Sequence, residues 1–144
     1  MVHESSYDLE RFVQAQEGLY QQAQAELRTG KKRSHWMWFI FPQIEGLGSS
    51  EMAVRYAISS LEEAHAYLAH PILGMRLREC ADMVLNLDGK AIGEIFEYPD
   101  DLKFHSSMTL FAHAAGQSQQ NRVFSRVLDK YFAGKEDAAT EERI

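Results

Sequence analysis

The chain has 144 residues, of which 45% are hydrophobic, and a chain of this size is typical of one domain with its own core. Its single cysteine, Cys80, excludes an intrachain disulfide and a cysteine-rich metal site, and its formal net charge of −6 disfavours attraction to nucleic acids or anionic membranes. Neither an apolar run of the ~20 residues that cross a bilayer nor a signal-peptide pattern is present. We therefore expect a cytoplasmic protein without membrane association.

Apolar residues recur with the helical period along most of the chain. The first expected helix covers residues 8–28, and Gly30 is suited to end it. Further helices are expected over residues 34–41, 51–58, 60–69, 72–87, 99–115 and 121–132, with a short helix or turn over 90–96. For residues 34–41 an extended run is the alternative, because Trp, Phe and Ile favour strands and eight residues are too few for periodicity to decide. Because no segment alternates apolar and polar residues as a strand does, the sequence predicts an all-α fold, an irregular multihelical globule of about seven helices in a single domain.

Both ends of the chain are mainly polar. We expect residues 1–6 to be flexible, residues 7–134 to form the helical domain and residues 135–144 to be a polar, loose tail.

Residues 31–43 read KKRSHWMWFIFPQ and join a basic run to the most aromatic segment of the chain. Trp36 and Trp38 could stack on a planar ligand while the neighbouring cations neutralise a phosphate group. The alternative is that the aromatic side chains are core and the cations are solvated. The segment therefore points to a nucleotide-type ligand only if its tryptophans are accessible.

The loop GLGSS at residues 46–50 comes directly before an expected helix. Backbone N–H groups of glycines, serine hydroxyls and the helix dipole together suit an anion. The lysine and the spacing of a P-loop are missing, and no strand precedes the loop, so an ordinary capped loop is the alternative.

Polar side chains flank the apolar stripe of the helix expected over residues 99–115. At helical spacing, one side carries Asp100, Lys103 and Ser107, and another carries Ser106, Thr109 and His113. Serine and threonine are mediocre residues for a helix interior, so their number here indicates a tertiary role. That role is either ligand binding or hydrogen bonding between packed helices.

No metal centre or other cofactor is expected. His105 and His113 are eight residues apart, and neither their spacing nor a nearby acidic cluster resembles a metal site. Cys80 falls on an apolar helix face, which is typical of a small core residue rather than a nucleophile.

The blocks at residues 34–43 and 99–111 resemble the bacterial family catalogued as domain of unknown function 1810, and the similarity continues in order over nearly the whole chain. The resemblance implies a small, all-helical, cytoplasmic single domain, and it brings no activity. Some members carry the label calpastatin, but calpastatin is extended, disordered and proline-rich, whereas this chain has 3 prolines and enough apolar residues for a core. Glu97 and Glu141 depart from the family pattern, which has glycine and an apolar residue at these positions.

The resemblance also selects the motif positions that are more polar than packing requires. With Arg33 added for its charge, the candidate ligand-binding residues are Arg33, Trp36, Trp38, Gln43, Asp100, Lys103, Ser106, Ser107 and Thr109, and the candidate catalytic residue is His35. We expect a pocket for a small anionic or nucleotide-type ligand. Hydrolytic or transfer chemistry on a phosphorylated or ADP-ribose-like substrate would use His35 as proton carrier. The alternative is a non-catalytic protein-interaction or self-association module with an exposed apolar patch over residues 36–41.

Overall fold

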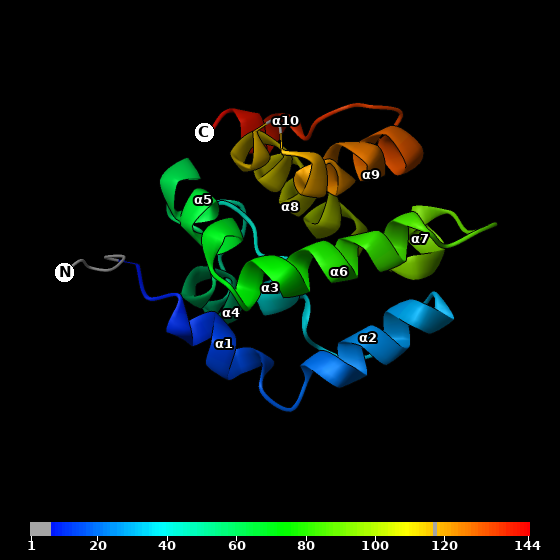
Figure 1. Cartoon of the computed structure of the whole chain (residues 1–144), viewed down its shortest axis with the longest axis horizontal. Helices are drawn as coiled ribbons and strands as arrows, with labels where there is room; N and C mark the ends of the chain where they lie inside the picture. Colours follow the sequence, from blue (N-terminus) through cyan, green and yellow to red (C-terminus); the bar gives the residue numbers. More distant parts are fainter. Residues whose placement is uncertain (1–6, 117) are drawn as a thin grey trace.

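The computed structural model describes residues 7–116 and 118–144, and over these residues it confirms the all-α prediction (Figure 1). The expectation for residues 1–6 lies outside the described residues. The helices are α1 (Glu10–Gln16), α2 (Tyr20–Thr29), α3 (Met37–Ile40), α4 (Glu51–Arg55), α5 (Leu61–Ala69), α6 (Leu73–Leu85), α7 (Ile92–Ile95), α8 (Asp100–Ala115), the 3-10 helix η1 (Gln119–Asn121), α9 (Val123–Phe132) and α10 (Ala138–Glu141). Within the described part of the chain, none of them is both long and apolar enough to cross a membrane.

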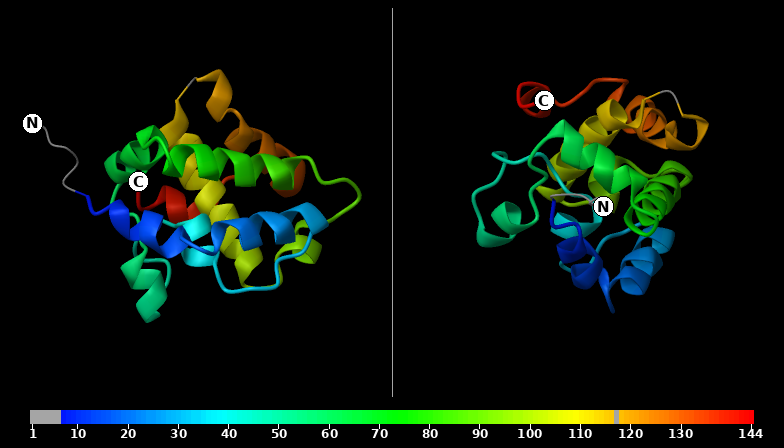
Figure 2. Two further views of the ribbon diagram at one scale, coloured as in Figure 1. Left: turned by 60° about the horizontal axis from the view of Figure 1, so that its bottom comes forward. Right: turned by 60° about the vertical axis from the view of Figure 1, so that its left-hand side comes forward.

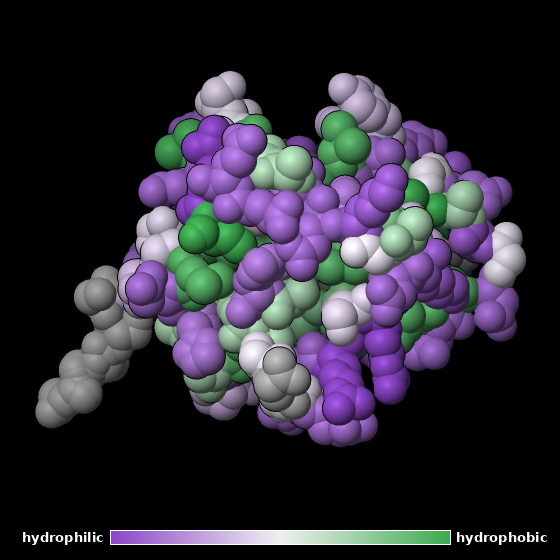
Figure 3. Space-filling view, turned by 90° about the horizontal axis from the view of Figure 1, so that it is seen from above, coloured by the Kyte–Doolittle hydropathy of each residue, from purple (hydrophilic) through white to green (hydrophobic). Residues whose placement is uncertain are grey.

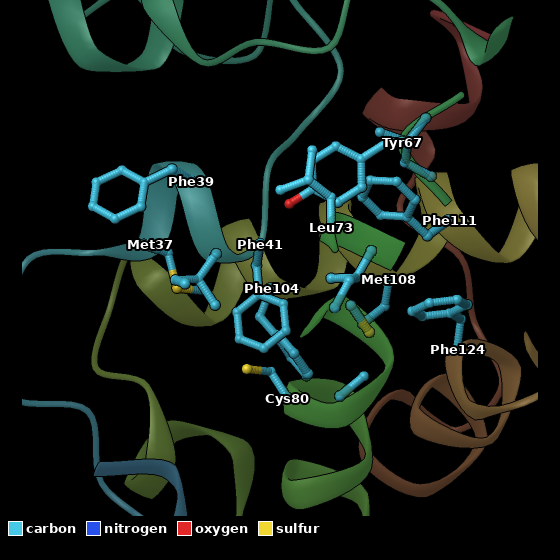
Figure 4. Packing of buried hydrophobic residues seen from close by; sticks show 14 of the residues in the cluster. Met37, Phe39, Phe41, Tyr67, Leu73, Cys80, Phe104, Met108, Phe111 and Phe124 are labelled. Atoms are coloured by element: carbon cyan, nitrogen blue, oxygen red, sulfur yellow. The ribbon is translucent and has the colours of Figure 1, made fainter. Parts of the chain in front are cut away.

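Helix α8 is the central element, because it packs against α5, α9, α10 and α7. The ring of Phe104, which belongs to α8, lies 4.9 Å from the ring of Phe41 and 4.7 Å from that of Phe96, measured between ring centroids. Figure 4 shows the buried side chains of Phe41 and Phe104 near Cys80 of α6. Cys80 is fully buried in this core, as the sequence indicates. The aromatic segment before Pro42 therefore contributes mainly to the interior.

The first expected helix, over residues 8–28, is wrong in one respect, because the structure divides it into α1 and α2. Gly18 lies between them with a φ of 76°, a left-handed conformation that interrupts a right-handed helix. The division lets α1 pack against α3 while α2 packs against α6. The side-chain amide of Gln16, at the end of α1, is buried and donates to the carbonyl of Phe39 at 2.7 Å.

Two expected helices are shorter than predicted. The helix over residues 34–41 is the single turn of α3, and the helix over 51–58 ends at Arg55. Ile58 instead donates its N–H to the carbonyl of Gln43 at 2.8 Å, and its carbonyl accepts from the N–H of Glu45 at 2.8 Å. This isolated bridge closes the loop that carries α4, which projects from the body of the molecule at the lower left of the left-hand view in Figure 2.

Residues 135–144, expected to be loose, include helix α10, which packs against α8. Asp137 begins this helix, since its carboxylate accepts from the backbone N–H of Thr140 at 3.0 Å. The same carboxylate accepts from the hydroxyl of Ser106 on α8 at 3.2 Å. Thr140 is fully buried, so the chain end covers part of α8 (Figure 1).

Candidate ligand-binding site

A buried carboxylate on α2 organises the basic and aromatic segment that follows. Glu26 is 8% exposed, and its Oε1 accepts from the backbone N–H of Arg33 at 2.8 Å and of Ser34 at 3.0 Å. The same atom accepts from Nε1 of Trp36 at 2.8 Å. Burial alone would raise the pKa of Glu26, but hydrogen bonds led by the Ser34 hydroxyl outweigh it and lower the pKa to about 2. Glu26 is therefore an ionised anchor for this segment.

Glu26 is not among the functional residues predicted from the sequence. It is an acidic residue on the otherwise apolar face that places Ala23 and Leu27 in the core. Buried carboxylates are rare unless they are paired or hydrogen-bonded. A glutamate at a core-facing position of this helix was therefore the signal that could have pointed to Glu26.

Trp36 is a core residue and not a ligand platform. Its side chain is fully buried, and its indole N–H is already used by Glu26. Phe39 and Phe41 are also buried, with exposed fractions of 4% and 0%. The predicted stacking role of Trp36 is therefore wrong, and residues 36–41 do not form the exposed apolar patch of the alternative hypothesis.

Trp38 differs from Trp36, because it is partly exposed and its indole nitrogen has no hydrogen-bond partner within residues 7–116 and 118–144. The ammonium nitrogen of Lys103 lies 5.2 Å from the centre of the Trp38 ring, which is a cation–π distance. Trp38 and Gln43 line a narrow crevice of about 10 Å³, together with Gly46 and Gly48. The first and third predicted motifs therefore meet at this point.

Asp100 joins the basic run to the start of α8. Its carboxylate pairs with Lys32 at 2.8 Å and, more distantly, with Lys103 at 3.9 Å. Lys32 in turn lies 5.3 Å from the ring of Trp36. Asp100 is therefore neutralised chiefly by Lys32, which leaves Lys103 placed between this carboxylate and the ring of Trp38.

The hydroxyl groups of α8 do not join this cluster. Ser106 donates to the carbonyl of Leu102 and to Asp137. Thr109 donates to the carbonyl of His105 at 2.9 Å and accepts the backbone N–H of Asp137 at 2.9 Å. Both therefore hold the C-terminal segment. Ser107 is fully buried, and its hydroxyl has no partner among the described residues.

Arg33 and His35 lie on the surface. Both are exposed, and no hydrogen bond or ion pair of either side chain is found in the described part of the chain. The structure thus brings together Trp38, Gln43, Asp100 and Lys103 from the predicted set. Ser106 and Thr109 instead contact Asp137 in the C-terminal segment.

The loop at residues 46–50 contributes a close approach that the sequence does not reveal. The guanidinium of Arg143 lies against Gly46, so close that a Cβ atom there would be 2.5 Å from Nη1. Ser50 caps α4 by accepting the N–H of Ala53, which agrees with the capped-loop alternative. Arg143 therefore brings a second cation to the loop that borders the Trp38 crevice.

A second polar cluster lies where α8 meets the chain end. His113 Nε2 is 2.7 Å from a carboxylate oxygen of Glu136, and Glu141 completes a group whose ligand-type atoms lie within 4.8 Å of one another. Glu141 and His113 lower the pKa of Glu136, whereas Glu136 raises the pKa of Glu141. His113 is 23 residues from Glu136, so spacing along the sequence gave no sign of the cluster.

The comparisons place these observations in a family. The family model described as "Protein of unknown function (DUF1810)" matches residues 6–144. The chain belongs to the DUF1810 family. It is similar to the conserved hypothetical protein Rv1873 from Mycobacterium tuberculosis, known from a crystal structure, with 55% sequence identity, a TM-score of 0.91 and 96% of each chain covered. No curated protein matches it. Membership of DUF1810 thus confirms the resemblance found in the sequence.

Proposed function

We propose that this DUF1810 protein binds a small anionic ligand of the phosphorylated or nucleotide type at the face formed by Trp38, Gln43 and Lys103. The observation that carries the proposal is the indole N–H of Trp38, a buried donor without a partner among the described residues, on a ring whose centre lies 5.2 Å from the ammonium nitrogen of Lys103. An N–H donor and a cation at the same indole ring suit an anionic ligand better than either group alone.

The energetics favour a ligand at this donor. A buried polar group without a hydrogen bond costs about 1–3 kcal/mol, which an accepting oxygen would recover. Lys103 can serve a second anion, because Asp100 already has a shorter ion pair with Lys32. The exposed cation Arg33 adds positive charge to the same segment of the chain.

The size of the crevice sets how a ligand can bind. A volume of about 10 Å³ is near the smallest that holds one water molecule, so one ligand oxygen can enter while the rest stays on the surface. Stacking is then left to the accessible part of Trp38. For a reaction, the exposed His35 is the proposed proton carrier, since an imidazole can both accept and donate a proton through its ring nitrogens.

The test is isothermal titration calorimetry with AMP, ADP-ribose and inorganic phosphate as probes. We expect saturable binding of at least one probe, weakened about tenfold or more by Lys103→Met or Trp38→Phe. Lys135→Met is the matched control, because Lys135 is exposed and its ammonium group makes no contact within the described residues. Absence of heat with all three probes, or equal weakening by Lys135→Met, would overturn the proposal.

A further inference from the structure

We propose that His113, Glu136 and Glu141 form a site for one divalent transition-metal cation of the zinc class. The site is separate from the proposed anion site, since His113 lies ten residues along α8 from Lys103, an axial rise of about 15 Å. It also runs against the expectation from the sequence that the protein has no metal centre.

The three side chains offer the ligand types that zinc prefers outside cysteine sites, one imidazole nitrogen and two carboxylate oxygens. Zinc bonds of about 2.0–2.2 Å in tetrahedral geometry separate neighbouring ligand atoms by roughly 3.3 Å. The atoms of this cluster all lie within 4.8 Å of one another, and His113 Nε2 is 2.7 Å from Glu136. Side-chain rotations that move each ligand atom by a few tenths of an ångström to about one ångström therefore suffice to enclose an ion.

These rotations are available because the side chains are not locked by packing. His113 and Glu136 keep 38% and 34% of their side-chain surface exposed, and Glu141 is exposed. Figure 3 views this side of the molecule from above and shows a mainly hydrophilic surface with smaller apolar areas between. A cavity of about 210 Å³, lined by His113, Glu136 and Asp129 among others, leaves room for water in the remaining coordination positions.

Charge also favours a cation at this place. Two carboxylates that approach each other this closely repel, unless a proton or a cation lies between them. A neutral imidazole and two carboxylates carry a charge of −2, which a divalent ion balances. A protonated His113 balances only one of the two carboxylate charges, so a divalent ion neutralises the cluster more completely.

A bound ion would connect elements that are distant in sequence. His113 belongs to the last turn of α8, Glu136 precedes α10, and Glu141 is the last residue of α10. The ion would therefore cross-link the chain end to the central helix.

The experiment uses Zn²⁺ with the metal-free protein, followed by calorimetry, thermal unfolding and the visible spectrum of bound Co²⁺. We expect one Zn²⁺ per chain and a rise in Tm of about 9 °C when free zinc exceeds its Kd 100-fold. Co²⁺ should give the absorption of a tetrahedral or five-coordinate site.

Glu141→Gln should weaken zinc binding at least tenfold and abolish the Co²⁺ spectrum, and His113→Asn should do the same. Glu142→Gln is the matched control, since it removes the neighbouring exposed carboxylate and should change neither readout. Circular dichroism verifies that the variants fold. No zinc binding by the unaltered protein, or the same affinity in Glu141→Gln as in Glu142→Gln, would overturn the proposal.

Discussion

Replacement of Glu26 by glutamine tests how the aromatic segment is held. The variant keeps the size of the side chain but removes the charge that accepts from Arg33, Ser34 and Trp36. The new amide group also presents a donor where the carboxylate accepts the Ser34 hydroxyl. We therefore expect the folded state to lose stability without a change in the overall fold.

The size of the loss follows from the titration of Glu26. A pKa lowered from 4.5 to about 2 corresponds to about 3 kcal/mol of preference of the folded state for the ionised form. For a chain of 144 residues, a loss of about 3 kcal/mol lowers Tm by about 10 °C.

The contribution of Glu26 to the free energy of unfolding should depend on pH. The folded-state pKa of Glu26 is depressed, so its contribution is fully present above about pH 4.5 and is lost as the pH falls toward about 2. The assay is urea unfolding of both proteins at several pH values between 7 and 3. Glu17→Gln, a change at an exposed glutamate, is the control and should have no effect. A difference below about 1 kcal/mol at pH 7, or one that stays constant to pH 3, would refute the reasoning.

Three further substitutions, one of them with a matched control, test the packing by unfolding and hydrogen exchange. Ser107→Ala removes a buried hydroxyl that has no partner in the described part of the chain, so the free energy of unfolding should stay equal or rise by up to about 1 kcal/mol. A fall would show that the hydroxyl has a partner. Gly74→Ala would bring a Cβ to 2.1 Å from the carbonyl oxygen of Leu68 and should lower the free energy of unfolding by about 1–3 kcal/mol or more. Gly93→Ala is the control, because open space surrounds Gly93, and it should not lower the free energy of unfolding. Asp137→Ala should cost about 1 kcal/mol and speed exchange in α10, and unchanged protection there would contradict its capping role.

Periodicity was enough to predict the long helices, because each buries an apolar stripe that a local window reveals. It joined α1 to α2, since the apolar pattern continues through Gly18 and only the backbone conformation there shows the break. It also missed α10, a helix of four residues whose packing against α8 depends on Asp137 and Thr140 rather than on an apolar stripe.

The site was predictable in part. Helical spacing correctly grouped Asp100 with Lys103, and it grouped Ser106 with Thr109 on another side. Spacing does not say which distant segment covers each side, and here the chain end covers the hydroxyl groups. Likewise, Trp36 and Trp38 are alike in sequence, yet the buried carboxylate of Glu26 holds only one of them in the core.

The central claim is that the buried indole N–H of Trp38 donates to a bound ligand, and proton–nitrogen correlation NMR observes this group directly. Trp36 is an internal control, because Glu26 already accepts from its indole N–H. Titration with ADP-ribose or inorganic phosphate should move the Trp38 indole signal to a saturating position and leave the Trp36 signal in place. If the Trp38 signal stays fixed at concentrations of both probes that are high enough for weak binding, the account of this site is contradicted.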